Sequence, residues 1–263
     1  MSESTHQCGG CGGCGSGQEP QPEPKLAPHS LSQIKTVIGI AGGKGGTGKS
    51  LVSGLLAAEL QKRGKQVGVL DADILAPAVA EMFHLPQGLT QGGEGLYPAL
   101  SEGGVKVVSV SLLLESATEP VTWHSPVMAT ILQQLWSRVI WDQLDCLIID
   151  LPPGTGDVTL AAFERLPLDG IIAVSTPQLA ATRALERTLL LAEEKQVPVL
   201  GLVENFASLF RGSALEELAK LYQLPIFDRL LFDPVLADAA DGGQIESLET
   251  SYLPNTVTQI AEM

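Results

Sequence analysis

Basic side chains and long apolar runs are both scarce in this sequence of 263 residues. It holds 16 lysines and arginines against 30 acidic residues, which gives a formal net charge of −14. Nucleic-acid binders need clustered Lys and Arg to neutralise phosphates, so this balance argues against that class of protein. No apolar run approaches the roughly 18 residues of a membrane span, and the N-terminus lacks the basic and then apolar pattern of a secretion signal. We therefore expect a cytoplasmic protein that binds neither nucleic acid nor membrane.

Cysteines are also few, and three of the four stand in one short segment. Cys8, Cys11 and Cys14 lie close together near the N-terminus, whereas Cys146 lies inside an apolar run. In a reducing compartment, closely spaced cysteines indicate a metal or catalytic site more often than disulfides. Cys146 is expected to be a buried core residue.

The first 33 residues differ in composition from the rest of the chain. Residues 9–17 contain only glycine, cysteine and serine, and residues 18–28 are rich in proline. Such a segment cannot bury enough apolar surface to fold by itself. The sequence therefore predicts a flexible tail with a candidate metal site over residues 1–33, and a folded body over residues 34–263.

Apolar strands alternate with longer helical patterns along the body. Several of these strands are apolar throughout, which is typical of a parallel sheet covered on both faces. The alternation predicts a doubly wound, mostly parallel α/β fold, with ligands at the carboxyl ends of its strands. The predicted strands are Thr36–Ala41, Gln66–Leu70, Val105–Val110, Cys146–Asp150, Gly170–Val174 and Val197–Val203, and the predicted helices are Gly48–Arg63, Pro126–Trp141, Ala180–Lys195 and Ser213–Tyr222.

A glycine-rich loop joins the first predicted strand to the first predicted helix. It matches G-x-x-x-x-G-K-[ST] in the strand–loop–helix setting that this phosphate-binding motif requires. Its glycines let consecutive N–H groups converge on phosphate oxygens at the positive end of a helix. Lys49 is placed to reach the β- and γ-phosphates of ATP, and the Ser50 hydroxyl to bind Mg²⁺. The expected nucleotide-binding residues of the loop are Gly43, Lys44, Gly45, Gly46, Thr47, Gly48, Lys49 and Ser50.

A second lysine, Lys44, stands at the start of this loop. Ordinary phosphate binding does not need a cation at that position. The form G-K-G-G-T-G-K-S resembles the deviant P-loop of the MinD/ParA-type ATPases. That resemblance implies a homodimer in which Lys44 reaches the partner's nucleotide and acts there as an arginine finger does elsewhere. The alternative is a solvated surface lysine.

Aspartates follow two of the predicted strands. Asp73 is the candidate for orienting or deprotonating the attacking water, as the matching aspartate does in that group. Asp71 could instead pin its loop through hydrogen bonds to backbone N–H groups. Asp150 ends an apolar strand, the pattern expected of a carboxylate that holds Mg²⁺ through water. Leu151–Asp157 follows with two prolines and two glycines, a stiff loop that could sense a γ-phosphate.

Five further motifs narrow the resemblance to the Mrp/ApbC branch of that superfamily, over essentially the whole body. The resemblance implies a dimeric, Mg²⁺-dependent ATPase of low turnover that binds an iron–sulfur cluster and passes it to apoproteins. It also implies that Asn205 contacts the adenine, although an Asn at a strand end is equally a turn residue. The motifs are Asp71–Ile74, Asp150–Asp157, Ser175–Gln178, Val203–Asn205 and Phe232–Pro234.

Two segments depart from the pattern of that branch. Val203–Gly212 lacks the C-x-x-C pair with which family members hold a bridging cluster. Leu75–Ala78 stands where the family commonly has Tyr-Gly-Pro-Ser. The bridging site is therefore missing, and only the tail can supply cysteine ligands for a cluster.

The tail cysteines have the spacing C-x₂-C-x₂-C, which opens the bacterial ferredoxin motif. We expect Cys8, Cys11 and Cys14 to bind a 4Fe–4S cluster, with a fourth ligand from His6 or a second subunit, or with one iron left open. A mononuclear Zn²⁺ or Ni²⁺ site of the Cys₃His type is the competing interpretation. Adventitious metal or disulfides formed on purification are a third.

The sequence thus predicts an ATP-hydrolysing iron–sulfur cluster carrier that acts as a homodimer, with apo iron–sulfur proteins as recipients. A nickel- or zinc-delivery NTPase is one alternative. A ParA-like positioning ATPase without cargo is another. Against that class stand the charge of −14 and a C-terminal segment, Glu246–Met263, that contains no Lys or Arg.

Overall fold

A computed structural model describes residues 24–114 and 125–263 of the chain. Cys8, Cys11 and Cys14 lie outside these ranges, so the cluster ligands expected from the tail stay a prediction. Among the helices of the described ranges, none combines the length and the apolar character needed to cross a membrane.

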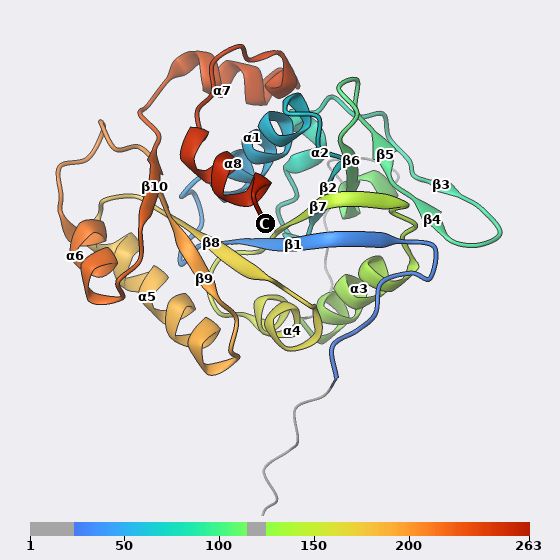
Figure 1. Cartoon of the computed structure of the whole chain (residues 1–263), viewed down its shortest axis with the longest axis horizontal. Coiled ribbons are helices and arrows are strands. Elements are labelled where there is room, and N and C mark those ends of the chain that lie inside the picture. The colour runs from blue at the N-terminus through green and yellow to red at the C-terminus, as the bar shows by residue number, and fades with distance from the viewer. Residues whose placement is uncertain (1–23, 115–124) are drawn as a thin grey trace, which may run out of the picture.

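The described residues form an eight-stranded sheet with the order β10-β9-β8-β1-β7-β2-β6-β5. Neighbouring strands are parallel except for β5 and β6, which are antiparallel. A separate antiparallel hairpin, β3 (Thr90–Gln91) and β4 (Leu96–Tyr97), projects at the side of the molecule (Figure 1). The predicted doubly wound, mostly parallel sheet is confirmed. Its strands are β1 (Gln33–Ala41), β2 (Val67–Asp71), β5 (Ala99–Leu100), β6 (Lys106–Ser109), β7 (Gln143–Asp150), β8 (Gly170–Ser175), β9 (Val199–Glu204) and β10 (Ile226–Arg229).

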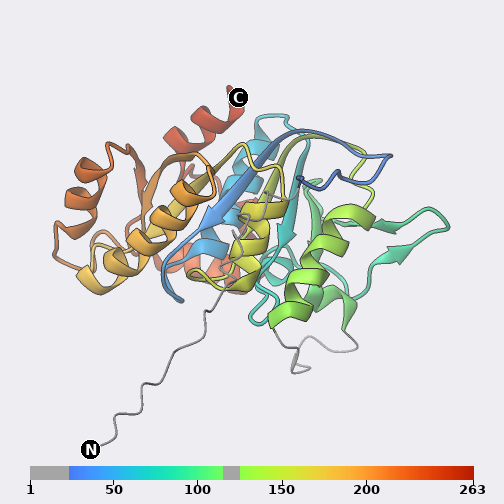
Figure 2. The ribbon, with the colours of Figure 1, turned by 90° about the horizontal axis from the view of Figure 1, so that it is seen from below.

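Helices cover both faces of the sheet, which explains why its central strands are apolar throughout. In β1, Ile38 and Ile40 enter the core on one face, and Val37 and Ala41 enter the core on the other. Figure 1 and Figure 2 show the two helical layers on either side of the sheet. The first layer is α1 (Lys49–Lys62), α2 (Val79–Met82), α7 (Pro234–Asp241) and α8 (Pro254–Ala261), and the second is α3 (Ser125–Arg138), α4 (Asp157–Arg165), α5 (Leu179–Glu194) and α6 (Ala214–Leu221).

The second predicted helix is shorter than expected at its C-terminal end. It was predicted to reach Trp141, but α3 ends at Arg138. The reason is a contact with the hairpin, because the Ile140 N–H donates to the Leu96 carbonyl at 2.9 Å. Trp136 and Trp141 are both fully buried, so these two tryptophans belong to the core.

The strand predicted from Val197 begins two residues later. Pro198 has no N–H to offer a neighbouring strand, and β9 starts at Val199. Helix α4 was not predicted, since it follows directly from the proline- and glycine-rich loop.

Residues 24–32 contact the body although composition assigned them to the tail. The Leu26 N–H donates to the Arg165 carbonyl at 2.7 Å, and the Leu26 side chain packs against the core of the second layer. The Ser32 hydroxyl donates to the Val139 carbonyl at 3.2 Å. The chain is therefore held against the body before β1 begins.

Candidate functional site

The glycine-rich loop connects β1 to α1 at the carboxyl edge of the sheet. A Cβ at Gly43 would lie 2.0 Å from the backbone nitrogen of Leu185, so only glycine lets the loop pass α5. Gly46 and Gly48 have φ values of 76° and 87°, in the left-handed region that favours glycine. A Cβ at Gly46 would meet no atom within 4 Å. The inner side of the loop is thus open to a ligand.

The two lysines of this loop have different surroundings. Lys49 is the first residue of α1 and is only 5% exposed, with its side chain along the wall of a cavity. Lys44 is exposed. The buried lysine is placed to meet a ligand held by this chain, and the exposed one is free to meet a group that comes from outside it.

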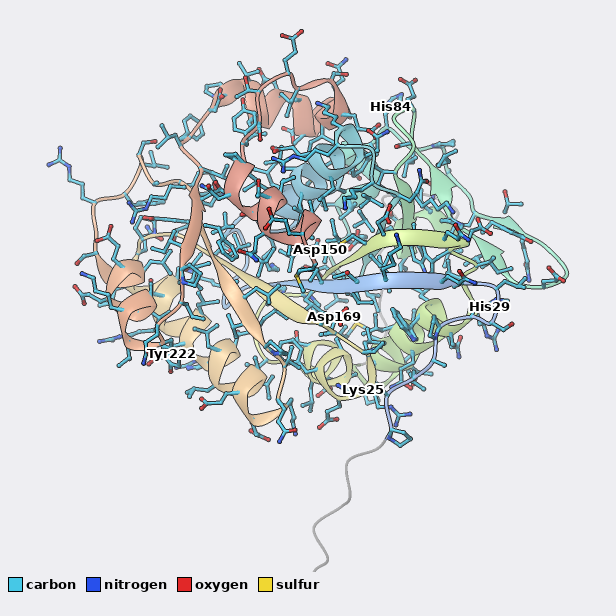
Figure 3. All side chains as sticks on the ribbon, in the orientation of Figure 1. Lys25, His29, His84, Asp150, Asp169 and Tyr222 are labelled. Carbon is cyan, nitrogen blue, oxygen red and sulfur yellow. The ribbon has the colours of Figure 1, made fainter. Side chains whose placement is uncertain are left out.

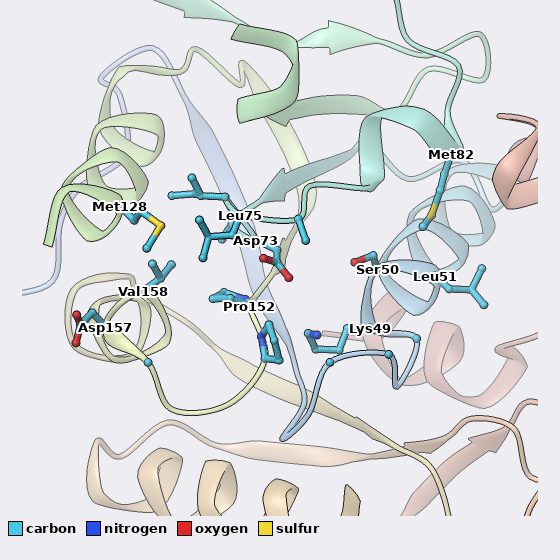
Figure 4. Close-up of a pocket in the computed structure, with 18 residues that line it drawn as sticks. Lys49, Ser50, Leu51, Asp73, Leu75, Met82, Met128, Pro152, Asp157 and Val158 are labelled. Atoms are coloured by element: carbon cyan, nitrogen blue, oxygen red, sulfur yellow. The ribbon is translucent and has the colours of Figure 1, made fainter. Parts of the chain in front are cut away.

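The cavity has a volume of about 600 Å³ and lies between the glycine-rich loop, the loop after β2 and the loop after β7. Figure 4 shows Lys49, Ser50 and Asp73 on one side of it and Met128 and Val158 on the other. Cations, hydroxyls and helix-terminal N–H groups at one side suit a polyphosphate. The apolar remainder is contributed by the loops, by the first turns of α3 and α4, by Leu51 of α1 and by Met82 of α2.

Asp71 is fully buried at the end of β2, and its carboxylate is saturated with hydrogen bonds. It accepts from the backbone N–H groups of Asp73, Ala78 and Val79 at 3.2, 3.2 and 3.3 Å, and from the Ser109 hydroxyl at 3.0 Å. Burial, followed by the neighbouring charge of Asp150, raises the pKa of Asp71 well above its usual range. The interpretation that Asp71 pins the loop after β2 is confirmed.

Asp150 is fully buried at the end of β7, and only one of its two carboxylate oxygens accepts a hydrogen bond from the described residues. Its Oδ1 accepts from the Ser53 hydroxyl at 2.8 Å, while its Oδ2 has no hydrogen-bond partner among the residues that the structure describes. Burial raises the pKa of Asp150 to about 6, against the lowering effect of the nearby Ser50 and Ser53 hydroxyls. The unpartnered Oδ2 of Asp150 and the nearby Ser50 hydroxyl are oxygen ligands of the kind that suits Mg²⁺.

Asp73 follows Asp71 and lines the cavity. Burial raises the pKa of the Asp73 carboxyl, and the ammonium of Lys49 opposes that rise. The hydrogen bond from the Asp73 N–H to Asp71 holds the residue in place. Asp73 is therefore a titratable group held beside the buried Lys49.

The loop after β7 contacts the glycine-rich loop directly. The Gly154 N–H donates to the Gly42 carbonyl at 2.8 Å, and the Leu151 N–H donates to the Ile40 carbonyl at 3.0 Å. Gly156, Asp157 and Val158 then line the cavity where α4 begins. A ligand that moves the phosphate loop consequently acts on this segment as well.

Asn205 is almost completely buried and holds the glycine-rich loop from the other side. Its Nδ2 donates to the Thr47 carbonyl at 3.0 Å, and its Oδ1 accepts from the Phe206 N–H at 2.9 Å. A Cβ at Gly48 would lie 2.1 Å from Asn205 Nδ2. The structure thus places Asn205 against the back of the loop, with both side-chain polar atoms engaged.

Sequence reasoning missed two serines of this site. Ser53 stands four residues after Lys49, on the same side of α1, and donates to both the Lys49 carbonyl and Asp150. That spacing was a usable signal. Ser109 ends β6 and reaches Asp71 only because β6 lies beside β2. No local signal pointed to it.

The structure thus gathers most of the predicted site residues at one edge of the sheet. Thr47, whose carbonyl accepts from Asn205, and Asp150 are buried and do not line the cavity. Lys44 stands at the exposed start of the loop. Those that line the cavity are Gly45, Gly46, Gly48, Lys49, Ser50 and Asp73.

Comparisons with known proteins agree with this geometry. A family model described as ParA, NUBPL iron-transfer P-loop NTPase, matches residues 33–263. An iron-sulfur cluster carrier protein of Clostridium perfringens is 36% identical over 235 residues, covering 82% of this chain and 83% of its own. One of Methanocaldococcus jannaschii is 34% identical over 227 residues, covering 81% of this chain and 78% of its own.

Solved structures share the fold. A nucleotide-binding protein from Archaeoglobus fulgidus, described in complex with ADP and with cobalt, superimposes with a TM-score of 0.73 at 35% identity, covering 83% of this chain and 90% of that one. The cell division ATPase MinD of Pyrococcus furiosus gives a TM-score of 0.63 at 18% identity, covering 86% and 97%. The second likeness concerns the fold alone.

Proposed function

Because the chain belongs to the NUBPL iron-transfer family of P-loop NTPases, we propose that it is an ATPase that carries an iron–sulfur cluster and transfers it to apoproteins. The observation that carries the nucleotide half is the cavity on which Lys49, Ser50 and Asp73 converge beside Asp150. The cargo half is supported by relatives named iron-sulfur cluster carrier proteins and by the three cysteines of the tail.

The phosphate groups of ATP would lie along the open inner side of the loop that ends in Lys49 and Ser50. Lys49 neutralises phosphate charge, and the N-terminus of α1 adds its positive dipole. The Ser50 hydroxyl and Asp150 Oδ2 would hold Mg²⁺, the latter directly or through water. Bound Mg²⁺ would draw charge from the phosphate oxygens. Ser53 keeps Asp150 turned so that Oδ2 stays available.

Asp73 would orient or deprotonate the attacking water. Burial raises the pKa of the Asp73 carboxyl, which makes its carboxylate a better proton acceptor than a solvated one. Lys44 would complete the site of a partner subunit in a homodimer, for which its exposure leaves it free. Adenine contact by Asn205 would require its Nδ2 to leave the Thr47 carbonyl.

Cys8, Cys11 and Cys14 would hold the cluster, of the 4Fe–4S type, on residues 1–33 of a chain whose NTPase unit spans residues 34–263. The recipients would be apo iron–sulfur proteins. Closely spaced cysteines that bind a metal group rather than form disulfides are typical of a reducing compartment, which supports a cytoplasmic location.

Nucleotide turnover tests the first half of the proposal. We expect Lys49→Ala to abolish ATP hydrolysis, because it removes the buried cation from the phosphate site. Lys35→Ala is the matched control, since Lys35 lies on β1 but pairs with Asp145 at the amino edge of the sheet. If Lys49→Ala still hydrolyses ATP, the assignment of this cavity as the nucleotide site is wrong.

Anaerobic reconstitution with iron and sulfide tests the second half. The wild-type chain should show sulfide-to-iron absorption with matching iron and acid-labile sulfide, and a triple Cys8/Cys11/Cys14→Ser variant should show neither. A tail that takes up zinc or nickel but no iron and sulfide would favour a metal-delivery NTPase instead.

A further inference from the structure

The first described residues of the chain are fastened to the C-terminal end of α4. The Lys25 ammonium donates to the Phe163 carbonyl at 2.5 Å, and the Leu26 N–H donates to the Arg165 carbonyl at 2.7 Å. Trp136 of α3 donates its Nε1–H to the Leu26 carbonyl at 3.1 Å. Figure 3 shows Lys25 beside these two helices. One short segment therefore makes three hydrogen bonds to two helices.

These contacts match what a helix C-terminus offers. The last carbonyls of a helix have no partner within it and carry a partial negative charge. Lys25 brings a cation and Leu26 an amide to two of those carbonyls. The Leu26 side chain adds apolar contact with the core that contains the buried Trp136. The segment is held by charge, hydrogen bonding and packing together.

The other end of α4 belongs to the nucleotide site. Gly156, Asp157 and Val158 line the cavity, and the loop before them bonds to the phosphate loop through the Gly154 N–H. A helix of this length spans about 13 Å, so a displacement at one end is passed to the other as a rigid-body shift. α4 thus connects the loop after β7, which bonds to the glycine-rich loop, with the segment that holds residues 25 and 26.

We propose that Lys25 and Leu26 are positioning residues that couple the cysteine-bearing tail to the nucleotide state through α4. Movement of the loop after β7 on hydrolysis shifts α4, and the shift loosens or tightens the anchor of the tail. Cys14 lies eleven positions before Lys25, so its backbone stays within about 40 Å of the anchor whatever path the chain takes. The coupling rests on the nucleotide half of the proposed function, and only its cargo aspect rests on the iron–sulfur half.

Hydrogen–deuterium exchange on the full chain tests the coupling without any cargo. The amide of Leu26 should exchange at least threefold differently with ADP than with a non-hydrolysable ATP analogue. In a Lys25→Ala/Leu26→Ser variant, the nucleotide should still alter exchange in residues 151–158, while the amides of residues 25–27 exchange fast in both states. Trp136→Phe, which removes one donor and keeps an aromatic ring in the core, should reduce the nucleotide effect at Leu26. Lys35→Ala should leave it unchanged.

The outcomes separate the two proposals. A nucleotide effect in residues 151–158 with none at Leu26 overturns the coupling and leaves the proposed function intact. An effect in neither segment overturns both the coupling and nucleotide switching. An effect at both sites in a chain that binds no cluster supports the coupling and overturns the cargo assignment. If the chain loads a cluster, the rate at which a chelator removes the cluster should differ between the ATP-bound and ADP-bound states. In the Lys25→Ala/Leu26→Ser variant, the ratio of these two rates should fall to about one.

Discussion

Strands β2 and β7 lie side by side, and each ends in a buried aspartate at the same level of the sheet, Asp71 paired in register with Asp150. Asp71 accepts four hydrogen bonds, two of them from the loop that follows its own strand and one from the first residue of α2. Asp150 accepts on one oxygen from Ser53 and keeps the other without a partner among the described residues. Both carboxyl groups have raised pKa values because both are buried.

The difference lies in how each buried group is satisfied. A buried carboxylate that is saturated by the protein contributes to the fold, since each donor that it accepts would otherwise be left unpaired. A buried carboxylate with a free oxygen costs stability in the empty protein, and that cost is recovered when a ligand arrives. In the proposed function, the two strand ends therefore have different roles: Asp71 holds the structure, and Asp150 binds the ligand.

Removal of the saturated carboxylate should have the largest effect. We expect Asp71→Ala to lower the free energy of unfolding by about 3–5 kcal/mol, because it leaves several buried hydrogen-bond donors without an acceptor. Urea unfolding followed by far-ultraviolet circular dichroism measures the loss. A loss below about 1 kcal/mol would show that the loop after β2 does not depend on Asp71.

The same experiment on the other carboxylate should give a different pattern. We expect Asp150→Asn to change the free energy of unfolding by less than about 1 kcal/mol, because the amide oxygen can still accept from Ser53. ATP turnover should fall by about 10²–10³-fold, or roughly 3–4 kcal/mol of barrier. Steady-state phosphate release at saturating Mg²⁺ measures it. Equal losses of stability in Asp71→Ala and Asp150→Asn would contradict the distinction between a structural Asp71 and a ligand-binding Asp150.

Ser53 should have a smaller effect, because it acts through Asp150. We expect Ser53→Ala to lower turnover about 10-fold and to raise the Mg²⁺ concentration needed for half-maximal rate, as changes behind a metal ligand do. Ser53→Thr should restore most of the rate. Ser137→Ala is a matched control, since the Ser137 hydroxyl also bonds a carbonyl one turn back in its own helix. An unchanged Mg²⁺ dependence in Ser53→Ala would contradict the positioning role.

The sequence was most informative where function depends on consecutive residues. The glycine-rich loop could be predicted from its pattern and setting, since backbone conformation and the placement of Lys49 and Ser50 are local properties. The alternating apolar strands and helices were sufficient for the fold, because a parallel sheet must be apolar on both faces. The carboxyl ends of the strands then indicated where Asp73 and Asp150 would gather.

What the sequence could not supply are contacts that exist only after strands and helices pair. Ser109 reaches Asp71 through the pairing of β6 with β2, and Asn205 reaches Thr47 across more than 150 positions of the chain. Lys25 and Leu26 were placed in the tail on composition, yet both bond to α4. A proline-rich segment can be recognised from its residues, whereas the helix end that receives it cannot.

The ion pair at the amino end of β7 gives the smallest predicted effect on stability, and the direction of its pH dependence is fixed by the pKa shift of Asp145. Asp145 pairs with Lys35 at 2.5 Å in an ion pair open to solvent, and its hydrogen bond to Lys35, with one from the Gln66 N–H, lowers the pKa of the Asp145 carboxyl. The unfolded chain therefore binds a proton more readily than the folded one, so this stability is present above the usual carboxyl pKa and is lost as the pH falls through the lowered value.

We accordingly expect Asp145→Asn to cost less than about 1 kcal/mol at neutral pH. The difference in the free energy of unfolding between this variant and the wild type should vanish at acidic pH, where Asp145 is protonated. It should shrink at high salt, because the ion pair is exposed and screened. Urea midpoints at neutral and acidic pH, each at low and high ionic strength, measure it. A cost that persists in acid would mean that Asp145 acts through hydrogen-bond geometry rather than charge, and the contrast between the exposed and buried ends of β7 would then need a different physical basis.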